Sequence, residues 1–452
     1  MNDDLAAKVR EDFPALVASL RELIRIPSVS AAGYPAEEVR RSADHVAGLL
    51  RDRRFEGVRL LELEGAHPAV FADKPGPEGA PTVLLYAHHD VQPPGPIEEW
   101  ETGPFEPFEK EGRLYGRGAS DDKAGIIMHL GAVDAFDGEL PVSVKVLVEG
   151  EEEIGSAHLG EFLDVYADLL AADVIVIGDS GNWRVGQPAL TTSLRGLVAC
   201  TVELRTAANA VHSGLYGGVF PDALMSLSRL IATLHDDSGQ VAVPGLVSQE
   251  SDALDLTESE IRQQMGAVPG LQTIGSGGLT SRMWTKPAIS VVAVDAPPVG
   301  QAINQLVPVA RAKISMRIAP GQDPVEAMNA LRSHLIANVP WGADLTIVHT
   351  EMGAPFHLPV SGTAPEAWKT AMREVWGTDV VEMGVGGSIP FVADFSSRYP
   401  ASAILLTGCG EPTSAAHAPN ESQHLGDLEN CILAEAIALR LVGSGAPATH
   451  GA

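Results

Sequence analysis

Apolar residues near the start of the chain recur with the spacing of a helix. They stand at Leu16, Leu20, Leu23 and Ile24, and Pro27 closes the run. Such spacing places one apolar stripe on a helix, and a proline cannot continue it. The pattern therefore predicts an N-terminal helix that packs one face against a core.

Farther along, short and continuous apolar runs alternate with helical stretches. Runs of this kind, rich in β-branched residues, are typical of strands buried on both faces of a parallel sheet. Their alternation with helices predicts an α/β domain with a largely parallel sheet. The predicted strands are 82–87, 142–148, 174–177 and 403–406, and the predicted helices include 37–50 and 125–136.

The middle of the chain has a different order of elements. It reads strand, helix, strand, strand, helix, strand, which is the ferredoxin-like βαββαβ motif. These elements are predicted at 197–205, 222–235, 288–294, 310–318, 324–338 and 344–350. The polar, glycine-rich stretch 236–282 is expected to be an insertion inside the motif. We therefore expect a small domain, 190–352, inserted into a larger α/β domain formed by 1–189 and 353–452.

Length and charge narrow the class of protein. The 452 residues favour two or three domains, and a 45% hydrophobic fraction excludes wholesale disorder. The chain has 31 Lys and Arg against 59 Asp and Glu, a net charge of −28. So acidic a chain repels nucleic-acid phosphates and anionic membrane surfaces, so we expect neither partner. No apolar run approaches the ~20 residues that span a bilayer.

The cysteines and the N-terminus indicate a compartment. Cys200, Cys409 and Cys431 are far apart and odd in number, so no disulfide framework is expected. Residues 1–11 are charged and lack the apolar stretch of a signal peptide. The cytoplasm is the expected location.

Acids or histidines follow several of the predicted strands. In open α/β sheets the ligand lies at the carboxyl ends of the strands, so side chains far apart in sequence can meet there. Four segments have this feature, although the strand before the second is only weakly marked: 86–90 (Tyr-Ala-His-His-Asp), 116–123 (Gly-Arg-Gly-Ala-Ser-Asp-Asp-Lys), 149–156 (Glu-Gly-Glu-Glu-Glu-Ile-Gly-Ser) and 177–180 (Ile-Gly-Asp-Ser). A fifth, 410–417, follows the strand 403–406 and is placed to join them.

A site of His, Asp and Glu without Cys suits borderline divalent ions such as zinc. Carboxylates in one cleft repel each other unless cations neutralise them. Two ions ~3.5–4 Å apart, bridged by one carboxylate, meet that need and form a hydrolytic site. Each segment alone has a simpler explanation: a lone histidine packs or faces solvent, and the run 151–153 is a solvated acidic turn. The five segments together favour a metal site.

From 23–30 (Leu-Ile-Arg-Ile-Pro-Ser-Val-Ser) to His417, the chain resembles the metallopeptidases that include carnosinase, aminoacylase, glutamate carboxypeptidase and succinyl-diaminopimelate desuccinylase. It is most similar to the carnosinase-like, cytosolic dipeptidase branch, whose motifs are close to 211–218 (Val-His-Ser-Gly-Leu-Tyr-Gly-Gly) and 150–156. The resemblance implies a zinc-exopeptidase-like doubly wound sheet with an inserted ferredoxin-like domain. That domain would act as a lid and as the contact of a homodimer.

The resemblance also implies a set of metal ligands. His88 and Asp179 would bind the first of two divalent ions, Glu153 and His417 would bind the second, and Asp121 would bridge them. Zinc is the expected metal, with manganese and cobalt as alternatives. In this family the bridging aspartate precedes a cis peptide, so a cis bond is expected after Asp121.

Other residues receive catalytic roles from the same resemblance. Glu152 would be the general base, and Asp90, behind His88, would fix the tautomer of that imidazole. His212, in the inserted domain, would cross a two-fold interface and donate to the oxyanion in the partner's site.

Substrate contacts are implied in the inserted domain and in one later loop. Arg317 would hold the free carboxylate of the substrate, a task suited to a planar guanidinium, and Gly387 and Ser388 would add backbone donors near it. After the last histidine the chain has Ala-Pro-Asn at 418–420, where the dipeptidase branch usually has Ser-Gln-Asn. The pocket wall is expected to differ there.

The expected function is hydrolysis of the amide bond of a dipeptide by a two-metal exopeptidase. An N-acyl-amino-acid deacylase or desuccinylase would use the same metal centre, and the sequence does not distinguish a substrate ammonium from an acyl group. A non-catalytic metal-binding protein is a more remote alternative. Glu152 beside a full ligand set argues against it, because a site without catalysis needs no base.

Overall fold

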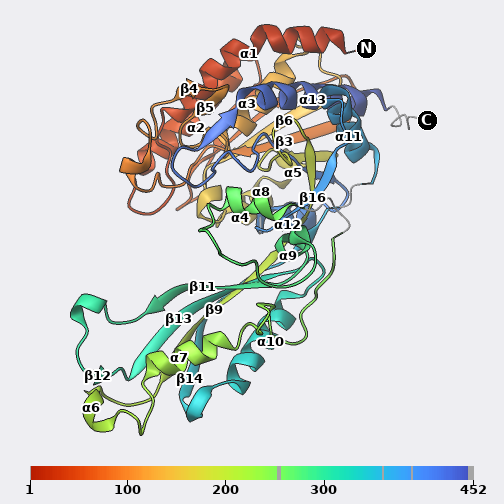
Figure 1. Cartoon of the computed structure of the whole chain (residues 1–452). Coiled ribbons are helices and arrows are strands. Elements are labelled where there is room, and N and C mark those ends of the chain that lie inside the picture. Colours follow the sequence, from red (N-terminus) through yellow and green to blue (C-terminus); the bar gives the residue numbers. More distant parts are fainter. Residues whose placement is uncertain (1, 252–255, 359–360, 388–389, 446–452) are drawn as a thin grey trace. The chain divides into compact units, whose positions relative to one another are not determined.

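The structure is a computed structural model that describes residues 2–251, 256–358, 361–387 and 390–445. The chain forms two compact units (Figure 1). Unit 1 comprises Met1–Thr192, Leu358–Met383 and Pro390–Ala452, and unit 2 comprises Ser193–His357 and Gly384–Ile389. Among the described residues, no helix is long and apolar enough to cross a membrane.

The largest sheet among the described residues is mixed and has nine strands in the order β1-β2-β6-β3-β7-β17-β8-β15, with β16 also paired to β8. Its strands from β1 to β17 in this order lie in unit 1. Its centre is parallel and consists of the four strands predicted from the sequence: β6 (Ser143–Glu149), β3 (Thr82–His88), β7 (Val174–Ile177) and β17 (Ala403–Leu406). The flanking strands are β1 (Glu56–Leu61), β2 (Ala69–Lys74), β8 (Ala189–Leu194), β15 (Phe356–His357) and β16 (Val381–Val385). The prediction of a largely parallel sheet is therefore correct for the centre and wrong for the edges, where the described pairings are antiparallel.

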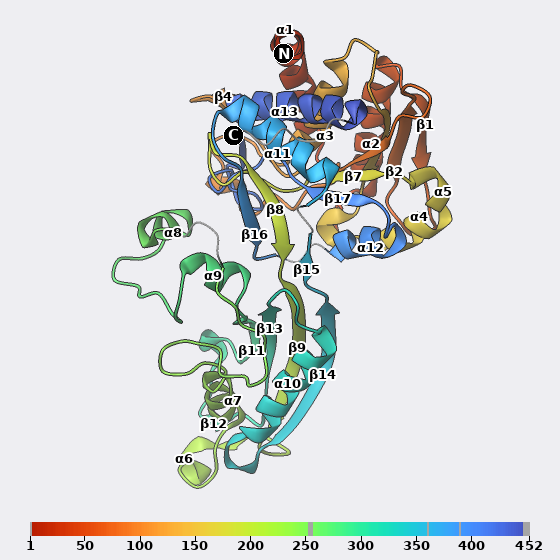
Figure 2. The same cartoon turned by 90° about the vertical axis from the view of Figure 1, so that its right-hand side faces the viewer.

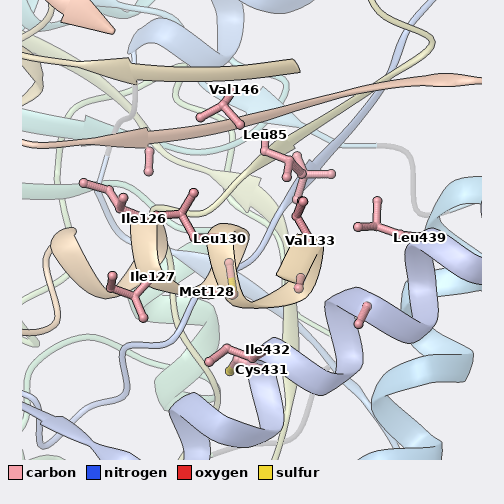
Figure 3. Packing of buried hydrophobic residues seen from close by; sticks show 14 of the residues in the cluster. Leu85, Ile126, Ile127, Met128, Leu130, Val133, Val146, Cys431, Ile432 and Leu439 are labelled. Carbon is pink, nitrogen blue, oxygen red and sulfur yellow. The ribbon is translucent and has the colours of Figure 1, made fainter. Parts of the chain in front are cut away.

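Helices cover both faces of this sheet. One face carries α1 (Asp3–Ile24), α2 (Ala36–Asp52), α3 (Lys123–Asp134), α11 (Thr363–Trp376) and α13 (Leu425–Ser444), whose apolar side chains form one core cluster with the sheet. In Figure 3, Leu85 and Val146 of the sheet meet Ile126 and Leu130 of α3, with Ile432 of α13 beneath. The other face carries α12 (Pro390–Arg398), α4 (Leu159–Val165) and α5 (Ala167–Leu170). There the ring of Tyr86 meets Phe395 of α12 edge-on, with centroids 5.6 Å apart.

A second, small sheet in unit 1 has the order β18-β5-β4. It comprises β4 (Phe108–Lys110), β5 (Arg113–Tyr115) and β18 (Ser422–His424). The segment 116–123 leaves β5 and enters α3, so it follows a strand as expected, although that strand belongs to this small sheet and not to the nine-stranded one. Since Ser422 pairs with Tyr115, the loop after β5 begins beside the point where the loop before β18 ends.

Unit 2 has a four-stranded antiparallel sheet in the order β11-β13-β9-β14 (Figure 2). Along the chain its elements are β9 (Gly196–Arg205), α7 (Ala223–Ala232), β11 (Ala288–Asp295), β13 (Val309–Ile318), α10 (Pro324–Ala337) and β14 (Asp344–Gly353). All six correspond to predicted elements. Both helices begin with an aspartate N-cap. The side chain of Asp222 accepts the backbone N–H of Met225, and that of Asp323, which precedes Pro324, accepts the backbone N–H of Glu326.

Short elements fill the connections of both units. They are β10 (Val211–His212), which pairs with β12 (Gln305–Leu306), then α6 (Ser213–Tyr216), α8 (Glu258–Gln264), α9 (Leu279–Trp284) and the 3₁₀ turns Ile97–Glu99, Glu152–Ile154, Val299–Gln301 and Pro340–Gly342. The apolar residues of β9, β13, α7 and α10 form a core that belongs to unit 2 alone.

Candidate metal centre and active site

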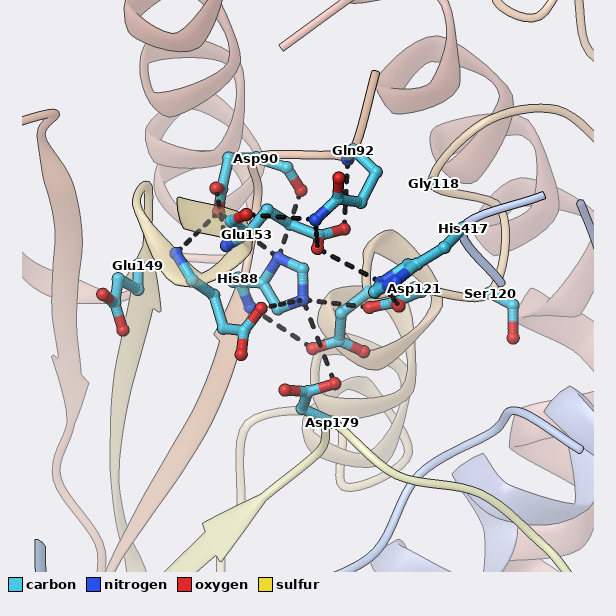
Figure 4. A network of polar contacts seen from close by, with 12 residues as sticks. His88, Asp90, Gln92, Gly118, Ser120, Asp121, Glu149, Glu153, Asp179 and His417 are labelled. Atoms are coloured by element: carbon cyan, nitrogen blue, oxygen red, sulfur yellow. Dashed lines mark hydrogen bonds and ion pairs between the residues drawn. The ribbon is translucent and has the colours of Figure 1, made fainter. Parts of the chain in front are cut away.

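The candidate site lies at the carboxyl ends of the parallel strands of unit 1 (Figure 4). His88 is the last residue of β3, and Asp179 follows β7 by two residues. The Nε2 atom of His88 lies 3.1 Å from Oδ1 of Asp121, 3.9 Å from Oε2 of Glu152 and 3.9 Å from Oδ1 of Asp179. The adjacent parallel strands β6, β3 and β7 thus bring together Glu152, His88 and Asp179, and the loop after β5 brings Asp121 to the same place.

A second histidine approaches the same aspartate from the opposite side. The Nε2 atom of His417 lies 2.9 Å from Oδ2 of Asp121 and 3.2 Å from Oε2 of Glu153. Each oxygen of Asp121 therefore faces a different imidazole, which is the position a bridging carboxylate takes. All five predicted metal ligands and Glu152 come together in unit 1.

The electrostatics of the cluster favour the binding of a cation. Burial, reinforced by the charge of Glu152, raises the pKa of Asp179 well above its usual range. Burial likewise raises the pKa of Glu152 to about 7, with Glu153 acting in the same direction and His88 opposing it. Hydrogen bonds to Asp121 and Glu153 raise the pKa of His417 to about 10. The carboxylates outnumber the imidazoles, so the cluster has an excess of negative charge that bound divalent cations would neutralise.

The donor set fits a divalent metal ion. One nitrogen or oxygen from each of His88, Glu152 and Asp179 lies within 4.8 Å of the others, and the same holds for His88, Asp121 and Glu153. Imidazole with carboxylate oxygen is the donor set of zinc and its borderline neighbours. Because the first group includes Glu152, these distances do not by themselves separate a general base from a ligand.

Asp90 fixes both the first histidine and the turn that carries the two glutamates. Its Oδ1 lies 3.3 Å from Nδ1 of His88 and accepts the N–H of Glu152, and its Oδ2 accepts the N–H of Glu153. Burial opposes protonation of His88, but hydrogen bonds to Asp121 and Asp90 raise its pKa well above the usual value. Asp90 thus orients one imidazole and two carboxylates together.

Two residues of this arrangement have no signal in the sequence. Ser30 donates its hydroxyl to Oδ2 of Asp90 at 2.6 Å. Gln92 donates its backbone N–H to Oε1 of Glu153 and its side-chain amide to Oε2. Both act on a partner distant in sequence, so only the folded chain shows them.

The neighbouring histidine takes a different environment. His89 is fully buried, and its Nε2 lies 3.0 Å from the carbonyl of Pro68. Burial lowers the pKa of His89 to about 4. This imidazole is a neutral packed side chain.

The predicted cis peptide between Asp121 and Asp122 is confirmed.

The remaining predicted site residues belong to unit 2. His212 is exposed at the start of α6, where its Nδ1 accepts the N–H of Gly214. Arg317 lies in β13, paired with Leu197 of β9. Gly387 is described and partly exposed, whereas Ser388 lies outside the described residues.

Sequence reasoning missed Arg195 of unit 2, which lies near Arg317 and the loop that carries Gly387. Its Nε donates to the carbonyl of Gly386 at 3.2 Å, so it fixes the loop predicted to supply backbone donors. Burial, with the charge of Arg317 as a further cause, lowers the pKa of Arg195 to about 10. Two guanidinium groups that repel each other favour an anion at this place.

A sheet that carries imidazole and carboxylate groups at the ends of its parallel strands defines the class of metal-dependent hydrolases. Residues 84–440 match the family model described as peptidase family M20/M25/M40. The chain belongs to this peptidase family, which confirms the predicted resemblance and the predicted class of enzyme.

Among curated relatives, the chain is 32% identical to cysteinylglycine-S-conjugate dipeptidase of Corynebacterium striatum, over 92% of this chain and 93% of the relative. It is 29% identical to the β-Ala-His dipeptidase of Rattus norvegicus, over 90% and 88%. Among solved structures, human carnosine dipeptidase 1 is similar with a TM-score of 0.82 and 24% identity, covering 98% of both chains. The last similarity shows a shared fold.

Proposed function

We propose that this protein is a metal-dependent dipeptidase, an exopeptidase that hydrolyses the amide bond of dipeptides with water activated at a pair of divalent ions. The observation that carries the proposal is the position of Asp121, with one oxygen 3.1 Å from His88 and the other 2.9 Å from His417. Relatives that match almost the whole chain are named as dipeptidases, which supports the substrate class.

In this proposal His88, Asp121 and Asp179 would hold the first ion, and Asp121, Glu153 and His417 would hold the second. Zinc suits this donor set best, and manganese and cobalt accept it as well. When bound, the ions supply Lewis acidity, which makes water a stronger nucleophile at neutral pH. The catalytic domain would comprise 1–189 and 353–452.

Glu152 acts as the general base. Its carboxylate accepts a proton from the attacking water and later returns it to the leaving amine. The carboxylate of Glu152 lies 3.9 Å from Nε2 of His88, and its side chain is 19% exposed, so it can contact the attacking water. Asp90 keeps His88 in one tautomer and holds the turn that carries Glu152.

The inserted domain, 190–352, would be a ferredoxin-like lid that binds the substrate. Its element order and its strand order β11-β13-β9-β14 support that reading. Arg317 would pair with the free carboxylate of the dipeptide, and Gly387 and Ser388 would donate backbone N–H groups beside it. His212 would stabilise the oxyanion that forms at the scissile carbonyl.

We further propose a homodimer formed through unit 2. Large apolar side chains are exposed around α6 and β12: Leu215 is 74% exposed, Val219 75% and Ile303 70%. The N–H of Ser213 donates to the carbonyl of Asn304, which joins these two segments. Several exposed apolar side chains on two joined segments favour contact with a second copy. The three cysteines are buried and free, which suits the reducing cytoplasm.

A substrate panel tests the proposal. The purified protein is stripped of metal, reconstituted with zinc, manganese or cobalt, and assayed on α-dipeptides, β-alanyl dipeptides and N-acyl amino acids. We expect hydrolysis of dipeptides with a free amine and a free carboxylate, lost on chelation and restored by metal. Preference for N-acyl amino acids would instead indicate the deacylase, and metal binding without hydrolysis of any substrate would indicate the non-catalytic alternative.

A further inference from the structure

A fully buried carboxylate lies beneath the loop that carries Asp121. Glu421 accepts four hydrogen bonds, all from residues 117–121. The N–H groups of Ser120 and Asp121 donate to its Oε1 at 2.9 and 3.0 Å. The N–H of Gly118, at 3.0 Å, and a guanidinium nitrogen of Arg117, at 2.6 Å, donate to its Oε2.

The same residue belongs to the loop that carries His417. Glu421 follows His417 by four residues and directly precedes β18. Its own carbonyl accepts the N–H of Gly116 at 2.9 Å, so backbone and side chain both bind the facing loop. Glu421 is therefore the point where the two loops that present Asp121 and His417 are joined.

The negative charge of Glu421, and not only the shape of its side chain, is needed to hold its four donors. Arg117 is 1% exposed and lies over the ring of Trp100, with 5.6 Å from its guanidinium carbon to the centroid, and a buried cation without an anionic partner is costly. All four donors point at two oxygens, and hydrogen bonds to an ionised acceptor are shorter and stronger than neutral ones. A glutamine would turn an amide N–H₂ group toward some of these donors and would leave Arg117 without an anion.

The distances at Asp121 depend on this anchor. Glu421 holds the N–H of Asp121, while the carboxylate of Asp121 lies 3.1 Å from His88 and 2.9 Å from His417. We infer that Glu421 is a positioning residue that sets the placement of Asp121 relative to His417 and so fixes the geometry of the metal pair. The inference rests on the proposed function in one respect, that Asp121 and His417 bind metal.

Metal affinity of the full-length protein tests the inference. Wild type and Glu421→Gln are stripped of metal and titrated with zinc in competition with a chromophoric chelator, at a temperature where circular dichroism shows both to be folded. We expect two zinc ions in the wild type and at least ~10-fold weaker binding in Glu421→Gln, the usual range for residues that orient ligands.

Asp134→Asn is the matched control. Asp134 is at the opposite end of α3 from Asp121, and its carboxylate pairs with Arg53 at 2.8 Å with both side chains mostly buried. This variant removes a paired carboxylate from the same unit, so it should lose thermal stability while its zinc affinity stays within about twofold of wild type. A parallel loss of zinc affinity in both variants would overturn the inference, because general destabilisation would then explain it.

The outcomes separate this inference from the proposed function. A wild-type protein that binds no divalent ion would overturn both. Two ions in the wild type with unchanged affinity in Glu421→Gln would overturn only the positioning role. If Glu421→Gln does not fold, Arg117→Lys replaces it, since lysine keeps the charge but cannot serve Glu421 and the carbonyl of Pro93 together. A ~3–10-fold loss of zinc affinity is expected there, and unchanged affinity would refute the role of the anchor.

Discussion

Glu152 and Glu153 are adjacent in sequence but have different surroundings. Gln92 and His417 contact the carboxylate of Glu153, and its side chain is 3% exposed. The carboxylate of Glu152 lies 3.9 Å from His88, and its side chain is 19% exposed. One is enclosed as a ligand would be, and the other stays open to water.

The first prediction concerns this difference. Glu152→Gln keeps the size of the side chain but cannot accept a proton, so kcat should fall by at least ~10². Metal content, measured by elemental analysis, should stay at the wild-type level, whereas Glu153→Gln should lose metal. Near-normal turnover in Glu152→Gln, or loss of its metal, would show that the base is assigned incorrectly.

A second prediction concerns pH and a buried acid beside the site. Burial raises the pKa of Glu149 to about 8, while the hydroxyl of Tyr86 donates to its Oε2 at 2.5 Å and opposes the shift. The folded state therefore retains a proton that the unfolded chain releases near pH ~4.3. The free energy of unfolding should fall as pH rises from there to about 8, by up to ~1.4 kcal/mol per pH unit.

Glu149→Gln tests this sign. The variant cannot release the proton, so its stability advantage over wild type should grow between pH 6 and pH 8.5, as measured by urea unfolding of the metal-free proteins. The exposed Glu98 supplies the control, because Glu98→Gln should leave the pH slope unchanged. Equal slopes in wild type and Glu149→Gln would contradict the assignment.

Side chains at the site differ in how visible they are in the sequence. Asp121 stands in a short string of glycines and acids directly after a strand, so its type and position indicate metal chemistry, whereas His417 stands among alanines and is indicated by the family resemblance. Ser30 and Arg195 do not, because a serine and an arginine are common everywhere and act here through a partner distant in the chain. Recognising their roles requires the tertiary contacts.

At the scale of elements, α3 begins where the metal-binding loop ends. A methyl group on Gly125 would lie 2.2 Å from Oδ1 of Asp122, so the aspartate would have to move. Asp122 in turn accepts the backbone N–H of His88 at 3.3 Å. The first turn of this helix is therefore packed directly against the chain that presents His88.

The third prediction follows from that contact. Gly125→Ala should weaken zinc binding at least ~10-fold, although alanine favours a helix over glycine by ~1 kcal/mol. Gly131→Ala, in the same helix, is the control. Its methyl group would lie 2.8 Å from Leu16 and 2.9 Å from Ile432, so the free energy of unfolding should fall by ~1–3 kcal/mol. The zinc affinity of this variant should stay at the wild-type level. If Gly131→Ala weakened zinc binding more than Gly125→Ala does, the contact between Gly125 and Asp122 would not explain the loss of affinity.

The strands also differ in how far the sequence reveals them. β3, β7 and β17 are buried almost throughout, so their apolar runs are continuous and predictable. The edge strand β1 is mostly exposed, and its residues, Glu-Gly-Val-Arg-Leu-Leu, show no such run. Strands of three residues, such as β5, are too short for any periodicity to identify.

At the scale of the whole molecule, the proposed dimer would place His212 of each subunit in the partner's active site. The element order of the inserted segment is readable from sequence, because helix and strand periods alternate there over long runs. Self-association is not, since it depends on which apolar side chains remain exposed after folding, as Leu215 and Val219 do.

The fourth prediction tests the shared site by mixing two inactive variants. After subunit exchange, Glu152→Gln and His212→Ala should together recover about a quarter of wild-type activity, because half of the random dimers are mixed and each has one complete site. A mixture of Glu152→Gln with Glu153→Gln should recover no activity. Both residues act in the site of their own subunit, so each site of a mixed dimer keeps one of the two defects. No recovery after verified exchange, or full activity in a monomer, would rule out completion in trans.

The order of strands in unit 1 has a consequence for the folding of the chain during its synthesis on the ribosome. β17 pairs with β7 in the sheet, yet 225 residues lie between Ile177, at the end of β7, and Ala403, at the start of β17. At the usual ~5–20 residues per second, translation of that interval takes roughly 10 to 45 s. During that time β7 has an open apolar edge, the kind of edge that recruits other strands. A nascent chain stalled before residue 403 is therefore a natural client for chaperones and proteases, although most of its length has already been made.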